Sequence, residues 1–99
     1  MSAIVHLPRS LVALFPGAER RTIVEGTTVL QVIEALDQRH PGFRDRLVDA
    51  GPSLRAHINV YVAGGPADLT SAVPAGAIVH VIPAVSGGSV TSGAVAIRL

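Results

Sequence analysis

The sequence predicts a single α+β domain in which a mixed sheet of four to five strands packs on one main helix. The first observation is that apolar and polar residues alternate in several short segments, which is typical of strands with one buried face. The second is an amphipathic helical stripe in the middle of the chain. The third is that 99 residues, 48% hydrophobic and 15% charged, suit one folded core.

Two strands are expected before the helix. Residues 3–7 place three apolar side chains on one face, Ala3, Val5 and Leu7. Residues 11–15 are apolar and end at the Pro16-Gly17 turn signal. Residues 21–24 then predict a second strand, which pairs back on the first.

The main helix is expected to begin at Thr28, because Thr28 followed three residues later by Gln31 is a capping-box pattern. Apolar residues then recur at helical spacing along one stripe: Val29, Val32, Ile33 and Leu36. The His-Pro-Gly segment 40–42 ends the helix. A short second helix or turn follows, in which Phe43 and Leu47 face the core.

After a loop at residues 51–53, a third strand is expected at residues 57–62. Its alternation points three aliphatic side chains inward, Ile58, Val60 and Val62. Residues 63–66 are expected to form its turn, and a short segment at 67–69 returns beside it.

A last strand is expected at residues 78–82, ended by Pro83. It is apolar on both faces, as a central strand would be. The element order is therefore strand, strand, helix, strand, short strand, strand, so two hairpins flank one helix. The simplest assembly is one mixed sheet curled around the helix, which is the β-grasp arrangement.

Composition argues against several classes of function. The chain has no cysteine, which excludes disulfides, thiolate metal sites and a cysteine nucleophile. A net charge of +1 gives no electrostatic footprint for nucleic acid or for an anionic membrane. There is no basic secretory start and no apolar run long enough to cross a bilayer, so a soluble, cytoplasmic protein is expected.

The four histidines, His6, His40, His57 and His80, match no metal-ligand spacing. We expect ordinary surface histidines, with His6, His57 and His80 at outward strand positions. The arginine clusters at 20–21 and 44–46 suit a solvated face of mixed charge better than an acidic partner.

The chain resembles the bacterial sulfur carriers. This family includes the small subunit of molybdopterin synthase, the thiamine sulfur carrier and the carrier of a cysteine-synthesis route. The resemblance covers residues 3–88 and rests on the Asn-Val core of residues 57–62, on Gly76, and on the ending Ile82-Pro83-Ala84-Val85-Ser86-Gly87-Gly88. It implies the ubiquitin-like β-grasp fold and a carrier that is not itself an enzyme.

The resemblance also implies the chemistry of the terminal glycine. An E1-like adenylating enzyme uses ATP and magnesium to activate the carboxylate, here that of Gly88. Sulfur from a sulfurtransferase or sulfide then displaces AMP and leaves a thiocarboxylate, which a sulfur-accepting biosynthetic enzyme consumes. Gly87 has no Cβ and suits a tail that threads a narrow channel. The carrier itself binds no cofactor.

This chain departs from the family at the tail, because residues 89–99 continue beyond Gly88. The carbonyl of Gly88 is joined to Ser89 in an amide and cannot be adenylated. In the leading interpretation, residues 1–88 are the domain and a peptidase, such as a JAB-type zinc metalloprotease, cuts between Gly88 and Ser89. Alternatively, residues 89–99 add an edge strand, or the protein only binds its partners.

Partners are expected to bind the end of the last strand and the segment that follows it, which we call the stalk. Ile78 and Ile82 should point away from the core and form a docking patch, unless Leu11, Phe15 or the extension covers them. The stalk consists of Ile82 followed by Pro83, Ala84, Val85 and Ser86.

Two other classes of function remain open. One is a ubiquitin-like modifier conjugated through Gly88, and the other is an interaction module with a permanent tail. The product that receives the sulfur is not indicated by the sequence.

Overall fold

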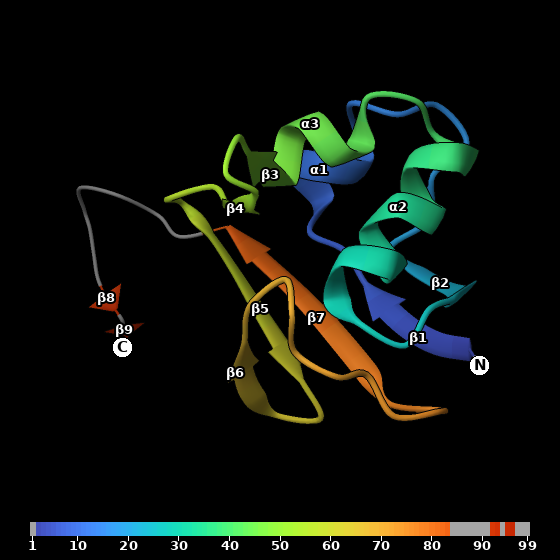
Figure 1. The fold of residues 1–99 in the computed structure, drawn as a ribbon. Coiled ribbons are helices and arrows are strands. Elements are labelled where there is room, and N and C mark those ends of the chain that lie inside the picture. The colour runs from blue at the N-terminus through green and yellow to red at the C-terminus, as the bar shows by residue number, and fades with distance from the viewer. Residues whose placement is uncertain (1, 84–91, 94, 97–99) are drawn as a thin grey trace.

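The computed structural model describes residues 2–83, 92–93 and 95–96. A five-stranded sheet has the strand order β2-β1-β7-β5-β6. Its strands are β1 (Ser2–His6), β2 (Arg21–Glu25), β5 (Ile58–Val62), β6 (Gly65–Ala67) and β7 (Ile78–Pro83). The helices are α1 (Arg9–Val12), α2 (Val29–Arg39) and α3 (Phe43–Leu47), and they gather on one side of the sheet (Figure 1).

The last strand is the central one, as predicted. β7 pairs in parallel with β1 and antiparallel with β5, while β1–β2 and β5–β6 are antiparallel. Val79 and Val81 of β7 are buried toward the helices, whereas Ile78 and Ile82 are exposed on the other face. One mixed sheet packed on one main helix is the β-grasp arrangement, so the predicted fold is confirmed.

The cap of α2 confirms the predicted helix start and adds a detail. The Thr28 hydroxyl accepts a hydrogen bond from the Gln31 backbone N–H at 3.2 Å. The Gln31 side chain reaches back to Thr27, whose N–H and hydroxyl both donate to Gln31 Oε1 at 2.8 Å. All four residues of the predicted stripe are buried. The capping box therefore closes on the residue before the N-cap.

The end of α2 is joined to α3 by the side chain of Asp37. Its Oδ1 accepts hydrogen bonds from the backbone N–H groups of Gly42 and Arg44, at 3.1 Å and 2.9 Å. This contact holds the turn that sends Phe43 and Leu47 into the core, where both are fully buried as predicted. Among the described residues the buried core is entirely apolar.

Several predicted boundaries are wrong. The turn after β5 has only two residues, Ala63 and Gly64, both with positive φ, so Gly65 already belongs to β6. Such two-residue turns match the twist of the flanking strands. The predicted return segment at 67–69 therefore begins too late.

Three further segments differ from expectation. His57 lies in a turn before β5, because the Ile58 N–H donates to the Arg55 carbonyl. The predicted loop at 51–53 instead joins a small hairpin of β3 (Val48–Asp49) and β4 (Ser53–Leu54). The apolar segment before Pro16 overlaps the short helix α1.

A second small hairpin is described near the C-terminus. β8 (Ser92–Gly93) pairs antiparallel with β9 (Val95–Ala96), in a two-stranded sheet of its own. None of the described helices is long and apolar enough to span a membrane.

Candidate functional site

The predicted site residues fall into two groups. Ile78, Ile82 and Pro83 belong to β7, where Ile78 is 39% exposed and Ile82 is 45% exposed. Both isoleucines point away from the core, as predicted. The others lie outside the described residues: Ala84, Val85, Ser86, Gly87, Gly88 and Ser89.

The strand register brings isoleucines together in one row. Residues directly opposite each other on neighbouring strands share a face of the sheet. Ile4 pairs with Ile23 on β2 and with Ile78 on β7. Ile23 is 53% exposed. These three side chains form an aliphatic row across the outer face, the face that points away from the helices.

The next row along the strands is polar. It runs across four strands and consists of Arg21, His6, His80 and Tyr61. We call it the imidazole row. Its two imidazole rings meet edge to face, with centroids 4.7 Å apart. Beyond it, Ile82 lies opposite Asn59, so exposed aliphatic side chains flank the imidazole row on both sides.

Burial and positive neighbours lower the pKa of His6 below its ordinary value of 6.5. Desolvation is the largest cause, followed by the charges of His80, Arg21 and Arg20. Arg20 is placed by a double contact with Leu7, the residue after β1, since the Leu7 N–H donates to the Arg20 carbonyl and Arg20 Nε donates to the Leu7 carbonyl. The imidazole of His6 is therefore held in its neutral form at pH 7.

Two shallow depressions meet at the end of β7, and Pro8 and Pro83 line both. One has a volume of about 270 Å³ and is also lined by His6, His80 and Arg20. The other, of about 200 Å³, is mainly apolar and is also lined by Leu14 and Ile58. β7 thus ends between aliphatic surface and a group of N–H donors, a combination that suits contact with another protein.

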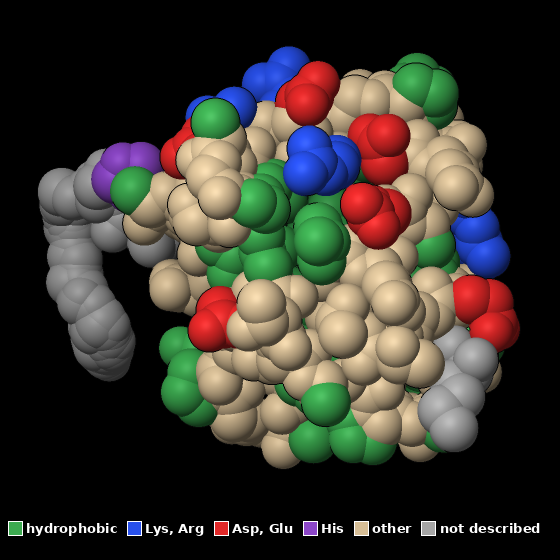
Figure 2. Space-filling model, in the orientation of Figure 1, with side chains coloured by type: hydrophobic (Ala, Val, Ile, Leu, Met, Phe, Trp, Pro, Cys, Tyr) green, Lys and Arg blue, Asp and Glu red, His purple; other side chains and the backbone are tan. Residues whose placement is uncertain are grey.

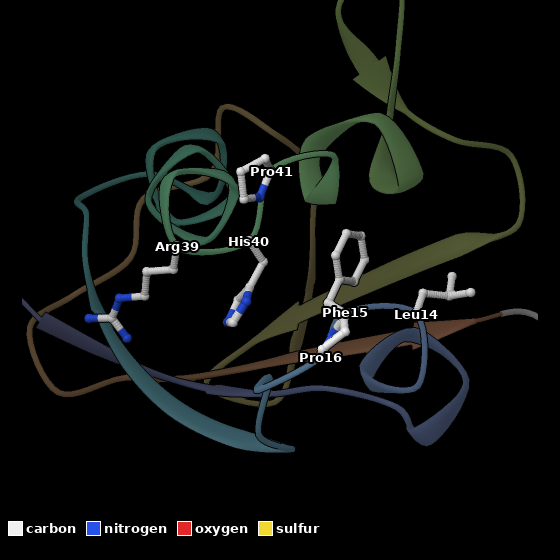
Figure 3. A pocket seen from close by; sticks show the side chains of 6 residues that line it. All are labelled: Leu14, Phe15, Pro16, Arg39, His40 and Pro41. Carbon is white, nitrogen blue, oxygen red and sulfur yellow. The ribbon is translucent and has the colours of Figure 1, made fainter.

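A third depression lies on the helical side. Arg39 and His40, at the end of α2, line it together with Phe15 and Pro16, and the His40 ring lies between Arg39 and Phe15 (Figure 3). The Phe15 ring packs on Phe43, with centroids 5.0 Å apart. On the view of Figure 2, basic and acidic side chains are interspersed around the helices. This mixture agrees with the solvated face expected for the arginines at 44–46, whereas Arg20 and Arg21 lie beside His6.

Sequence reasoning missed the imidazole row. His6 and His80 lie on the outer face as predicted, but they contact each other and are partly buried. Only the parallel register of β1 and β7 brings them together, and alternation within each strand does not encode that register. No group of three or more potential metal ligands occurs within the part of the chain that the structure describes.

The comparisons with known proteins identify the family. The sequence matches the ThiS family over residues 8–88, a match that ends at Gly88. None of the curated proteins matches the sequence.

Solved structures share the fold. A chain of the Amycolatopsis orientalis BexX/CysO complex is 32% identical, with 87% of this chain and 99% of that chain covered and a TM-score of 0.76. SAMP1 from Haloferax volcanii is 31% identical, covering 89% and 100%, with a TM-score of 0.74. Mycobacterium tuberculosis CysO is 26% identical, covering 84% and 99%, with a TM-score of 0.74. The chain therefore belongs to the ThiS family of ubiquitin-like sulfur carriers.

Proposed function

We propose that this protein carries sulfur as a thiocarboxylate on Gly88. A peptidase of the JAB zinc type first cuts between Gly88 and Ser89. An E1-like adenylating enzyme then uses ATP and magnesium to form the acyl-adenylate of Gly88. Sulfide displaces AMP and gives the thiocarboxylate directly, whereas a persulfide from a sulfurtransferase gives an acyl disulfide that a thiol reductant then cleaves to the thiocarboxylate. A biosynthetic enzyme accepts the sulfur for a cofactor, cysteine or a secondary metabolite. The protein itself contributes binding and no catalysis.

One observation carries this proposal: the family match ends at Gly88, a few residues after the central strand β7, whose outer face is exposed. The segment from Ala84 to Gly88 can extend at most ~18 Å from Pro83. An active site that takes hold of Gly88 must therefore lie close to the end of β7. Ile78, Ile82 and Pro83 are then placed to dock the same enzyme, with the stalk residues Ala84, Val85 and Ser86 held in its channel.

The first test is the intact mass of the protein isolated from its native cells. Processing predicts a mass ending at Gly88, with a fraction in which sulfur replaces one oxygen. A Gly88→Ala variant serves as the matched control and should lack the sulfur-containing form. A mass that retains residues 89–99 under conditions that demand sulfur transfer would refute both the processing and the carrier chemistry.

A second function, conjugation to other proteins through Gly88, is favoured by the likeness to the small archaeal modifier protein SAMP1. Both functions begin with the same adenylation, so only the fate of the activated glycine separates them. Mass spectrometry of digested cell protein should reveal Gly88 in an isopeptide with a lysine if the protein is a modifier. Finding only the free carrier and its thiocarboxylate would exclude conjugation.

A further inference from the structure

We propose that the imidazole row recognises a carboxylate on an acidic, otherwise apolar segment of the adenylating enzyme, and that docking takes up a proton. The row consists of Arg21, His6, His80 and Tyr61, with Arg20 beside it. The inference rests on the proposed function for the identity of the partner. It adds the chemistry by which the sheet face selects that partner.

The surroundings of the imidazole row favour a protein segment over a freely hydrated ion. The aliphatic row containing Ile4 and Ile78 lies on one side, and Ile82 lies on the other. A partner that covers these isoleucines also removes water from the imidazoles between them. Hydrogen bonds and charge interactions gain strength once water is excluded. A carboxylate flanked by apolar residues fits this pattern of side chains.

The charged side chains next to the imidazole row are positive. β2 contributes Arg21 opposite His6, Arg20 precedes it, β7 contributes His80, and β5 contributes the Tyr61 hydroxyl. The acidic residue of β2 is Glu25, which pairs with Ser2 at the far end of the strand, beyond the aliphatic row. The imidazole row itself contains only groups that can donate hydrogen bonds. It therefore complements an anion, and the neighbouring arginines oppose a divalent cation.

Proton uptake follows from the same arrangement. In the free protein, burial and the adjacent positive charges keep the pKa of His6 low, so its imidazole is neutral near pH 7. A carboxylate brought next to it favours the imidazolium and raises that pKa in the complex. Linkage then requires binding to tighten as pH falls through the interval between the free and bound pKa values.

The test measures binding of the full-length protein to its purified adenylating enzyme by calorimetry. Affinity should rise severalfold between about pH 8 and about pH 6, with net proton uptake detected in buffers of different ionisation enthalpy. The variant His6→Gln should lose most of the uptake. Arg21→Gln should weaken binding about tenfold and leave part of the uptake. Arg39→Gln, which removes a positive charge on the helical side, should change neither.

The outcomes separate the two proposals. Binding that is independent of pH and unaffected by Arg21→Gln would overturn the carboxylate site and leave the carrier function intact. Displacement of the enzyme by millimolar inorganic phosphate would show a general anion site and also overturn it. Failure of every form to bind the adenylating enzyme would instead refute the proposed function, and this inference with it. Arg21 is exposed, so its variant tests the site without threatening the core.

Discussion

The two faces of the main sheet are built from the same strands but carry different kinds of side chain. The face toward the helices is made of small aliphatic residues, among them Val5, Val60 and Val79, which are at most 2% exposed. The outer face alternates exposed isoleucines with the imidazole row. The buried inner face stabilises the fold, whereas the outer face keeps aliphatic and imidazole side chains accessible for binding. Neighbouring positions on one strand should therefore separate stability from function.

The largest contrast is expected at Val81 and Ile82, adjacent residues of β7. Val81→Asp places an unpaired carboxylate in the apolar core and should cost more than about 3 kcal/mol, enough to unfold much of a small domain. Ile82→Asp leaves the charge in water and should preserve the fold, but it should weaken docking to the adenylating enzyme about tenfold. Thermal unfolding and calorimetry measure the two effects. Similar melting temperatures for both variants would contradict the division between the faces.

A milder version of the contrast uses alanine at the preceding pair. Val79→Ala removes buried methyl groups and leaves a cavity, so it should lower the free energy of unfolding by about 2 kcal/mol. Ile78→Ala, on the exposed face, should cost less than about 1 kcal/mol. Urea unfolding with a common m-value gives both numbers. Equal losses would mean that Ile78 is buried in solution.

The turn between β5 and β6 belongs to neither face and offers a stabilising change. Ala63 has a φ of 50°, a conformation that costs energy for an alanine, and Gly64 follows with a φ of 86°. Ala63→Asn creates the Asn-Gly pair preferred in such turns and should raise stability by about 0.5–1 kcal/mol. Docking should be unchanged. A loss of stability on urea unfolding would show that the turn does not require positive φ at this position.

The smallest expected effect is on the pH dependence of folding stability. The pKa of His6 is lowered from 6.5, chiefly by burial and then by His80, Arg21 and Arg20. The unfolded chain therefore binds more protons than the folded one below about pH 6.5, so this histidine makes stability fall as the pH decreases. His6→Gln should flatten that slope, whereas His57→Gln, at an exposed turn position, should not. Identical slopes in wild type and His6→Gln would contradict the assignment.

The sequence was sufficient for the order of the main-sheet strands, for the main helix and for the buried face of each of those strands. The main helix depends on residues that are close together in the sequence, namely the cap formed by Thr28 and Gln31 and the apolar stripe from Val29 to Leu36. Their pattern can therefore be recognised without a structure. The central position of β7 was also visible, because a strand with Val79 and Val81 on one face and Ile78 and Ile82 on the other has little polar surface.

What the sequence did not show depends on register and on short-range geometry. His6 and His80 are far apart in the chain and meet only because β1 and β7 pair in parallel with one particular alignment. The turn at Ala63 was placed too broadly because the Gly64-Gly65-Pro66 run carries several breaker residues, of which only Gly64 is in the turn. The roles of Gly87 and Gly88 rest on family likeness and stay predictions.

The place of β7 in the sheet also has a mechanical consequence. Under the proposed function, an enzyme that draws the tail into its channel pulls on the end of β7, along the strand axis. Hydrogen bonds to β1 on one side and to β5 on the other then share that load in shear, so they have to break together and cannot open one after another. An edge strand such as β2 is hydrogen-bonded on one side only, so fewer bonds would resist the same force. If the proposed function holds, attachment to the central strand helps the domain to stay folded while enzymes pull on the tail.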